Sequence, residues 1–266
     1  MAPVTFTFDL EDSRPSPDLP ERFSAVTHRV LEFLDARGAR GTFFVVGELA
    51  AGHPQLIRAI ADAGHEVGLH GWRHVPLDKL DRDGFSEDLR RGKAAIEDAA
   101  GAPAPGFRAP IFSLFGPTLW AVEALMEAGF AYSSSVLPAA SPLYGYPDAS
   151  TRPYRWDAGL VELPCAVAGR GRAAIPFLGG VYLRYLPLRL VLALARRVAP
   201  GAAPWVYCHP YDFDPDEPFV VMPETTWLTS RILHARRRHT FDRVSALLDR
   251  FGAAPPLAEV AAAVPA

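Results

Sequence analysis

Two histidines, His70 and His74, lie four residues apart in the run His-Gly-Trp-Arg-His. Imidazoles at this spacing can bind one divalent ion from one side of a turn, which we expect to be helical. Three carboxylates, Asp9, Glu11 and Asp12, follow the first apolar run of the chain. Carboxylates this close repel one another unless a cation or an arginine compensates them. Either motif alone is common on protein surfaces, but together they predict a metal site.

The chemistry that such a site supports is hydrolysis. Two imidazoles and one carboxylate leave positions on a zinc-like ion for water and substrate. A second carboxylate can act as general base, and a histidine can protonate the leaving amine. Arg108, in Phe-Arg-Ala-Pro-Ile, is interpreted as a partner that orients Asp9 and keeps it ionised, or as a structural salt bridge. His209, in Tyr-Cys-His-Pro, is either a core residue or a general acid beside the metal.

These residues depend on a framework of alternating strands and helices. Strands are predicted at residues 4–8, 42–46, 65–70, 106–108 and 204–209, and helices at 21–37, 53–63, 85–100, 119–128 and 187–198. This alternation is typical of a parallel α/β fold. Asp9, His70, Arg108 and His209 each follow or end a predicted strand. Because the carboxyl ends of parallel strands gather at one face, we expect these four residues to meet there.

Two further segments are candidates for substrate binding. Residues 138–180 are rich in Pro, Gly and Tyr and predict a long binding loop with short strands, such as one at residues 160–163. Aromatic rings that could stack on a ligand are provided by Tyr144, Tyr146 and Trp156, and by Trp72 beside the histidine pair, but each of them could simply belong to the core. The basic run 231–239 predicts either a solvated helix face or contact with an anionic carrier of the substrate, such as a diphosphate.

Composition sets the broad class of the protein. With 266 residues, 49% of them hydrophobic and 21% charged, the chain is predicted to form one domain over residues 1–266. Its net charge of -3 gives no electrostatic reason to expect nucleic acid or an anionic membrane as partner. The two cysteines form no disulfide framework, no apolar run approaches the roughly 18 residues of a membrane span, and no signal-like segment precedes Asp9. We therefore expect a cytoplasmic protein.

The order of these motifs resembles the NodB homology domain of polysaccharide deacetylases, carbohydrate esterase family 4. The resemblance extends over almost the whole chain and rests on Gly41–Gly47, on Gly64-His-Glu66 leading into His70-Gly-Trp-Arg-His74, on Phe107–Pro110 and on Tyr207–Pro210. More narrowly, Asp9–Asp12, Arg108–Ser113 and Gly179–Tyr182 resemble a bacterial subgroup linked to exopolysaccharide and surface-glycan gene sets.

The resemblance implies a distorted (β/α)7-type barrel, a divalent ion that is usually zinc, and hydrolysis of the acetamido group of a sugar. By position, the resemblance makes Asp9 the general base and His70 and His74 metal ligands. It makes Arg108 the residue that orients Asp9, and His209 the general acid. The amide N–H of Ile111 stands where the family places an oxyanion donor. A backbone donor does not depend on its side chain, so isoleucine in place of the usual tyrosine is compatible with this role.

Three departures from the family pattern concern carboxylates. Leu10 occupies the position of the usual metal-binding aspartate, so the ligand is Glu11 or Asp12, and strand parity favours Glu11. An aspartate common in the subgroup after the tyrosine of the fifth strand is replaced by the run Ser133–Ser135. The carboxylate that tunes His209 has no clear counterpart, and the candidates are Asp212, Asp214 and Glu162.

Three functions compete at this point. The first is hydrolysis of an N-acetylated sugar, free or on a nucleotide or lipid carrier. The second is hydrolysis of another C–N amide bond, in a formamido sugar or a cyclic ureide. The third is a catalytically silent module that binds glycan, which the altered carboxylate motif favours. Retention of Asp9, Arg108 and His209 favours an enzyme, since a binding module needs no general base or acid.

Overall fold

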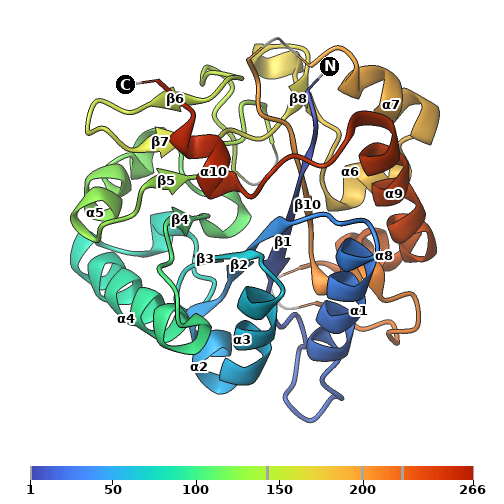
Figure 1. Ribbon diagram of the computed structural model, residues 1–266, viewed down its shortest axis with the longest axis horizontal. Coiled ribbons are helices and arrows are strands. Elements are labelled where there is room, and N and C mark those ends of the chain that lie inside the picture. The colour runs from blue at the N-terminus through green and yellow to red at the C-terminus, as the bar shows by residue number, and fades with distance from the viewer. Residues whose placement is uncertain (1, 142–143, 199–200, 223–224, 266) are drawn as a thin grey trace.

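The computed structural model describes residues 2–141, 144–198, 201–222 and 225–265. In these residues an eight-stranded sheet runs in the order β10-β1-β2-β3-β4-β5-β7-β6, and every neighbouring pair is parallel except β6 with β7. The sheet curls into a half-barrel with helices on its outer side (Figure 1). The predicted α/β barrel-like fold is confirmed.

The strands of this sheet are β1 (Thr5–Leu10), β2 (Gly41–Val45), β3 (Glu66–Leu69), β4 (Gly106–Phe107), β5 (Tyr132–Ser133), β6 (Tyr154–Arg155), β7 (Val161–Glu162) and β10 (Trp205–Cys208). A separate antiparallel pair is formed by β8 (Val167–Ala168) and β9 (Ile175–Pro176).

The helices of the first half are α1 (Phe23–Asp35), α2 (Gly47–Gly52), α3 (Pro54–Asp62), α4 (Arg82–Ala100) and α5 (Ala121–Glu127). Those of the second half are α6 (Gly180–Tyr185), α7 (Leu188–Ala195), α8 (Trp227–His234), α9 (Thr240–Phe251) and α10 (Leu257–Ala262). In Figure 1, α2 to α5 lie beside the blue-to-green strands, whereas α6, α7 and α9 lie on the opposite side of the molecule.

Strand β1 lies between β10 and β2 in the sheet, and all six of its residues are buried. Phe6 and Phe8 pack against Phe43 and Phe213. Since side chains alternate along a strand, the polar residues of β1 face the opposite way, and Thr7 donates a hydrogen bond to the Val206 carbonyl at 2.8 Å. The alternating pattern therefore marks a strand buried on both faces, with a polar interior.

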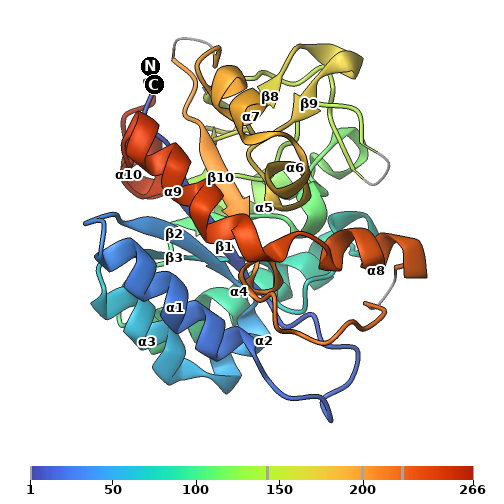
Figure 2. The same cartoon turned by 90° about the vertical axis from the view of Figure 1, so that its right-hand side faces the viewer.

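The register of the strands brings the predicted site residues to one end of the sheet. Within β1, Phe8 pairs with Cys208 of β10, so that Asp9 and His209 both follow this pair. On the other side Asp9 pairs with Phe44 of β2. Figure 2 shows the dark-blue loop after β1 and the orange segment after β10 projecting on the same side of the molecule. The expected convergence of strand ends is confirmed.

One local expectation was wrong. Residues 70–74 are not helical, because Gly71 and His74 have positive φ angles of 74° and 57°. The described residues of the predicted loop 138–180, from which residues 142–143 are excluded, contain four short strands, β6 to β9, and β7 lies within the predicted strand at 160–163. Helices α2 and α6 were not predicted, since each has only six residues and too few turns to show a periodic pattern.

No helix among the described residues combines the length and the apolar character that crossing a bilayer requires.

Candidate metal centre and catalytic site

The side chains of Glu11, His70 and His74 form a compact donor cluster. One possible ligand atom from each residue lies within 4.8 Å of the other two. Nε2 of His74 is 2.9 Å from a carboxylate oxygen of Glu11, and the two imidazole rings are 4.9 Å apart in an edge-to-face arrangement. The irregular turn at 70–74 therefore brings together the two imidazoles that the spacing of the sequence predicted.

His70 is prepared for a ligand by its backbone partner. Its Nδ1 donates a hydrogen bond of 2.8 Å to the Arg108 carbonyl, because a carbonyl oxygen can only accept. This bond fixes the tautomer and leaves Nε2 with its lone pair available. Burial lowers the pKa of His70 to about 4, so the ring is neutral at pH 7, as metal binding requires.

Glu11 is ionised in this environment. Burial by itself raises the pKa of its carboxyl, but the charge of His74 and the hydrogen bond from it lower the pKa well below its usual range. Burial likewise acts to lower the pKa of His74, and Glu11 reverses this and raises it. One carboxylate beside two imidazoles is a donor set that zinc prefers, so the residues fit a divalent ion.

Asp12, the second candidate for the carboxylate ligand, is engaged elsewhere. Its side chain accepts three hydrogen bonds from the Arg14 guanidinium, with an ion-pair distance of 2.6 Å. The geometry therefore favours Glu11 over Asp12, as strand parity predicted.

Asp9 lies beside the donor cluster with Arg108 as its partner. Nη1 of Arg108 is 2.6 Å from Asp9 Oδ1 and donates a second hydrogen bond of 2.7 Å to Thr7 Oγ1. Both charged side chains are almost completely buried. A guanidinium this close fixes the direction of the carboxylate.

The arginine is itself held on every side. Its Nε and Nη2 donate to the carbonyl and the hydroxyl of Ser134, at 3.1 and 2.9 Å. The rings of Phe44 and Trp205 cover the guanidinium at 4.1 and 4.2 Å. In the sequence the run Ser133–Ser135 stands out only as a departure from the family pattern, although three polar residues directly after Tyr132 were a signal that Ser134 has a polar partner.

His209 completes the group. Its Nε2 lies 3.9 Å from Asp9 Oδ2, and its Nδ1 lies 3.1 Å from Oδ2 of Asp212. The backbone N–H of His209 donates to the same oxygen at 2.8 Å. Burial by itself lowers the pKa of His209, but the hydrogen bond to Asp212 and the charges of Glu11 and Asp212 raise it to about 9. The imidazole is therefore charged at pH 7, as a general acid must be.

Asp212 is therefore the carboxylate that contacts His209. Asp214 pairs instead with Arg22. Glu162 accepts hydrogen bonds from the backbone N–H groups of Ser135 and Val136, at 2.8 and 3.0 Å, and so fixes the end of β5. The three candidates could not be separated by sequence, because the choice depends on the turn at Pro210–Phe213 that returns Asp212 to His209.

Ile111 lies on a short 3₁₀ turn, Pro110–Phe112, at the end of β4. Ile111 and Phe112 both have positive φ angles, 46° and 58°, which are strained for residues with a Cβ. Such strain persists only where surrounding structure imposes it, and it is common at functional sites. Ile111 is 37% exposed, so it lies at the surface of this end of the sheet.

The aromatic candidates for sugar stacking lie mostly in the core. Trp72 is only 7% exposed, and Arg91 covers its ring at 4.2 Å. Tyr146 and Trp156 are partly buried and pack against the main hydrophobic core. Tyr144 donates a hydrogen bond to Asp78 at 2.6 Å. This burial favours the core alternative for Trp72 most clearly.

One arginine of the basic run 231–239 is buried, whereas Arg231, Arg236, Arg238 and His239 are exposed. Arg237 is buried and forms an ion pair with Glu217. Arg231 covers the ring of Phe219 at 4.1 Å, and Arg236 that of Tyr185 at 5.1 Å.

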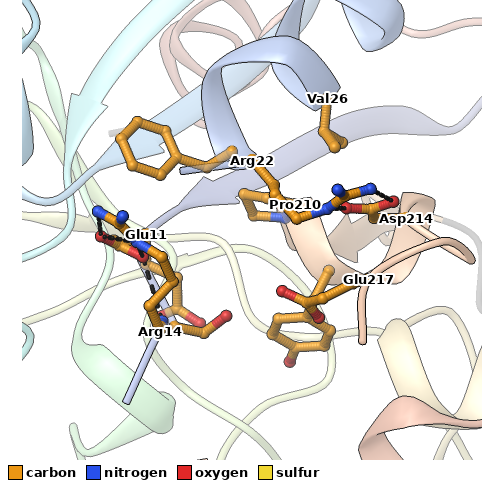
Figure 3. Close-up of a pocket in the computed structure, with 11 residues that line it drawn as sticks. Glu11, Arg14, Arg22, Val26, Pro210, Asp214 and Glu217 are labelled. Atoms are coloured by element: carbon orange, nitrogen blue, oxygen red, sulfur yellow. Dashed lines mark hydrogen bonds and ion pairs between the residues drawn. The ribbon is translucent and has the colours of Figure 1, made fainter. Parts of the chain in front are cut away.

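A small pocket adjoins Glu11, between the loop after β1, the start of α1 and residues 210–217 (Figure 3). Glu11 lies on one side of it, and Arg22 and Asp214 form their ion pair on another. Polar side chains from both halves of the chain therefore surround the space next to the donor cluster.

Comparison with known families divides the chain in two. Residues 2–130 match the family described as polysaccharide deacetylase, and residues 134–255 match a family described only as a domain of unknown function, DUF3473. The predicted resemblance over almost the whole chain thus holds for the family itself only in the first half. Asp9, the donor cluster and Arg108 lie in the first segment, whereas His209 and Asp212 lie in the second.

Curated relatives match only part of the chain. A peptidoglycan-N-acetylglucosamine deacetylase from Bacillus cereus is 29% identical over 123 residues, which are 46% of this chain and 41% of that protein. The chain thus matches less than half the length of this relative.

Solved structures match over almost the full length. A crystal structure from Mycobacterium smegmatis, described as a candidate polysaccharide deacetylase, is 25% identical with a TM-score of 0.65, covering 98% of this chain and 89% of that one. A Bacillus anthracis pseudoenzyme of the CE4 family has the same fold at 15% identity, with a TM-score of 0.55 and coverage of 97% and 65%. Residues 2–130 of the protein therefore form a polysaccharide deacetylase domain.

Proposed function

We propose that the protein is a metal-dependent deacetylase that hydrolyses the N-acetyl group of an amino sugar. The observation that carries this proposal is the meeting of three functional groups at one end of the sheet. The donor cluster of Glu11, His70 and His74 lies beside a buried carboxylate, Asp9, which is 3.9 Å from His209. A binding module has no need for a paired base and acid at a metal centre.

The proposed metal ligands are Glu11, His70 and His74, and zinc is the ion that suits two imidazoles and one carboxylate. When bound, the ion supplies a Lewis acid that polarises the amide carbonyl and acidifies the attacking water. The neutral His70 and ionised Glu11 are already in the protonation states that a metal requires.

Asp9 is the proposed general base. Its Oδ1 is held by Arg108, while its Oδ2 points toward His209 and is the oxygen left to accept a proton from water. The hydroxyl that results adds to the amide carbon, and the backbone N–H of Ile111 is the proposed donor to the developing oxyanion. Arg108 keeps Asp9 in place without taking part in the transfer.

His209 is the proposed general acid. Its charged imidazole gives a proton to the amide nitrogen as the C–N bond breaks, which releases acetate and a free amine. Asp212 holds Nδ1, so Nε2 is the nitrogen that faces Asp9 and the reacting atoms. One water is consumed, and the proton taken by Asp9 returns through His209 to restore both groups.

The proposed substrate is an N-acetylated amino sugar of a glycan, as the name of the Bacillus cereus relative suggests. The pocket next to Glu11 supports a hydroxyl-rich ligand, because its walls combine Arg14 and Arg22 with carboxylates. Paired guanidinium and carboxylate groups offer donors and acceptors together, which suits sugar hydroxyls.

We also propose that residues 1–266 act as one catalytic unit. The acid and base come from different matched segments, and Trp205 of the second segment covers Arg108 of the first. Neither segment contains a complete site.

The cytoplasm is the proposed compartment. This proposal rests on the two cysteines, Cys165 and Cys208, which are buried and not joined by a disulfide bond. An anionic carrier on the substrate remains a proposal for the exposed part of the basic run.

Acetate release from N-acetylglucosamine oligomers or peptidoglycan fragments tests the proposed function. We expect release with zinc-loaded protein and its loss after chelation, with recovery when zinc is restored. Formate release from a formamido sugar, or ring opening of a cyclic ureide, in place of acetate release would identify the second hypothesis. Glycan binding without turnover in zinc-loaded protein would identify a silent module.

A further inference from the structure

A second buried arginine lies behind the proposed acid. Arg184 on α6 is 1% exposed, and its Nε is 2.9 Å from Oδ1 of Asp212. The other oxygen of Asp212 holds both the backbone N–H and the Nδ1 of His209. Asp212 therefore lies between Arg184 and His209, and all three come from the segment whose family has no described function.

The chain before Arg184 is built for close approach to this group. Gly179 forms a parallel bridge to Tyr207 of β10, and a Cβ at Gly179 would lie 1.7 Å from the tyrosine ring. A Cβ at Gly180 would lie 3.1 Å from Asp212 Oδ2. Two glycines in succession thus allow α6 to begin directly against β10 and Asp212. The atoms nearest to a Cβ at either glycine belong to Tyr207 or Asp212 rather than to the proposed metal ligands or Asp9, so the role of these glycines lies at Tyr207 and Asp212.

The stability of the fold gives a weak reason for burying Arg184. A buried ion pair costs much of its attraction in desolvation, and apolar residues of the same size are often as stable. Among the described residues, Nη2 of Arg184 also has no hydrogen-bond partner, although Nη1 donates to the Ala235 carbonyl. An incompletely satisfied buried charge is costly, so a role beyond packing is expected.

We propose that Arg184 is a positioning residue for His209 that acts through Asp212. It fixes the carboxylate and takes up part of its charge, so that His209 remains oriented yet still releases its proton to the leaving amine. This inference rests on the proposed function and extends it from the family's first segment into the second. It assigns to residues 179–184 the task of supporting the acid half of the site.

The surrounding charges are consistent with this role. His209 faces Asp9 and Glu11 from the β1 side, Asp212 from its own segment, and Tyr211, whose ring stacks on the imidazole at 4.8 Å. His74 also contributes a charge on this side. Arg184 is the cation on the far side of Asp212. Burial would raise the pKa of Asp212, but Arg184 and His209 lower it, so the carboxylate stays ionised.

The test compares Arg184→Met with Asp212→Asn by the pH dependence of kcat. Without Arg184, His209 becomes the sole cation on Asp212 and holds its proton more tightly. The alkaline limb of the profile should then move to higher pH, and kcat should fall by about tenfold because a weaker acid protonates the amine more slowly. KM should be unchanged. Asp212→Asn should move the same limb to lower pH.

The opposite direction of the two shifts separates positioning from general loosening of the site. A limb that moves to lower pH in Arg184→Met, or does not move, would overturn the inference. In the Asp212→Asn background, Arg184→Met should have little further effect on kcat. An equal loss in both backgrounds would also overturn it, since Arg184 would then act independently of Asp212.

A matched control is Arg243→Met, because Arg243 binds the carbonyls of Leu183 and Leu186 at 2.6 and 2.7 Å. This change loosens the same helix without touching Asp212, so the alkaline limb should stay in place. If Arg184→Met does not fold, Arg184→Lys can be used instead, because it keeps the positive charge. We expect the alkaline limb of its kcat profile to lie close to that of the unmodified protein. A limb displaced to lower pH in Arg184→Lys would contradict the inference.

A readout that does not depend on turnover distinguishes this inference from the proposed function. The imidazole of His209 can be titrated by NMR in metal-free protein, and its pKa should be higher in Arg184→Met and lower in Asp212→Asn. If the pKa of His209 shifts in this way but the protein releases no acetate, the positioning role of Arg184 is supported and the deacetylase activity is rejected. If the pKa of His209 is unchanged in both variants of an active deacetylase, the proposed function stands and the positioning role is rejected.

Discussion

The proposed base and the proposed acid are supported by two similar arginine–carboxylate pairs with different surroundings. Asp9 is held by Arg108, and Asp212 is held by Arg184, with all four side chains buried. Arg108 donates hydrogen bonds to four acceptor atoms and lies between two aromatic rings. Arg184 keeps one nitrogen, Nη2, that has no hydrogen-bond partner in the part of the chain that the structure describes.

The difference follows from what each carboxylate faces. Oδ2 of Asp9 lies 3.9 Å from Nε2 of His209 and is the oxygen proposed to accept a proton, so Arg108 would have to hold this carboxylate against a changing charge. Asp212 lies between Arg184 and His209, so Arg184 would act on a proton that is held one step away, on the imidazole. The first pair belongs to the segment of known family and the second to the other segment.

Replacing the base should have the largest effect. Asp9→Asn keeps an oxygen for Arg108 but cannot accept a proton, so kcat should fall by about 10³-fold. The change also leaves Arg108 without its countercharge, so a loss of stability of about 3 kcal/mol is expected. Acetate release and thermal unfolding measure the two effects. Retention of more than a tenth of the activity in folded protein would remove Asp9 from the role of base.

Loss of the metal ligand should come next, and it also separates Glu11 from Asp12. Glu11→Gln removes one of three donors and should weaken zinc binding by more than about 100-fold. Asp12→Asn is the matched change, one residue along, and should alter zinc affinity by no more than about threefold because Asp12 forms an exposed pair with Arg14. Competition with a fluorescent chelator measures both affinities. A larger loss in Asp12→Asn would reverse the assignment.

The acid pair should give a smaller effect with a pH signature. A general acid works in its protonated form, so activity should fall as pH rises through the pKa of His209, which the hydrogen bond and the charge of Asp212 help to raise to about 9 against the opposing effect of burial. Asp212→Asn removes that hydrogen bond and charge, so the fall should begin at lower pH. At pH 7 the loss should be about tenfold, with a larger loss at pH 8.5.

Asp214→Asn provides the control for this pH effect, because Asp214 pairs with Arg22 rather than with His209. Its profile should keep the alkaline limb of the unmodified protein. An equal shift in both variants would mean that net charge, rather than the contact with Nδ1, sets the pKa.

Sequence was sufficient for the fold and for the strand ends because both depend on local patterns. Apolar runs, glycines after helices and the positions of Asp9, His70, Arg108 and His209 at strand ends are all visible in the chain. The partners of these residues were harder to predict. Ser134 and Arg184 meet the site through long-range packing, and Asp212 reaches His209 only because a 3₁₀ turn reverses the chain. Spacing in sequence carries no direct information on such contacts.

The two histidines illustrate a correct prediction reached through a wrong local structure. Their spacing suggested one side of a helical turn, yet the turn is irregular, with His74 at a φ of 57°. The imidazoles still meet, because Gly71 and the hydrogen bond from His70 to the Arg108 carbonyl direct the chain. A predicted meeting of two side chains can thus occur on a backbone conformation other than the predicted one.

The smallest expected effect concerns how completely Arg108 is held. Ser134→Ala removes the hydroxyl that accepts from Nη2 but leaves the carbonyl that accepts from Nε. Ser133→Ala is the neighbouring control, because its hydroxyl donates to Ser135 and not to the arginine. Both changes should cost about 1 kcal/mol of unfolding free energy. Only Ser134→Ala should lower kcat, by roughly threefold, since only it frees one edge of the guanidinium that holds Asp9. Equal kcat values for the two variants would show that the base is held by Thr7, the Ser134 backbone and the flanking rings alone.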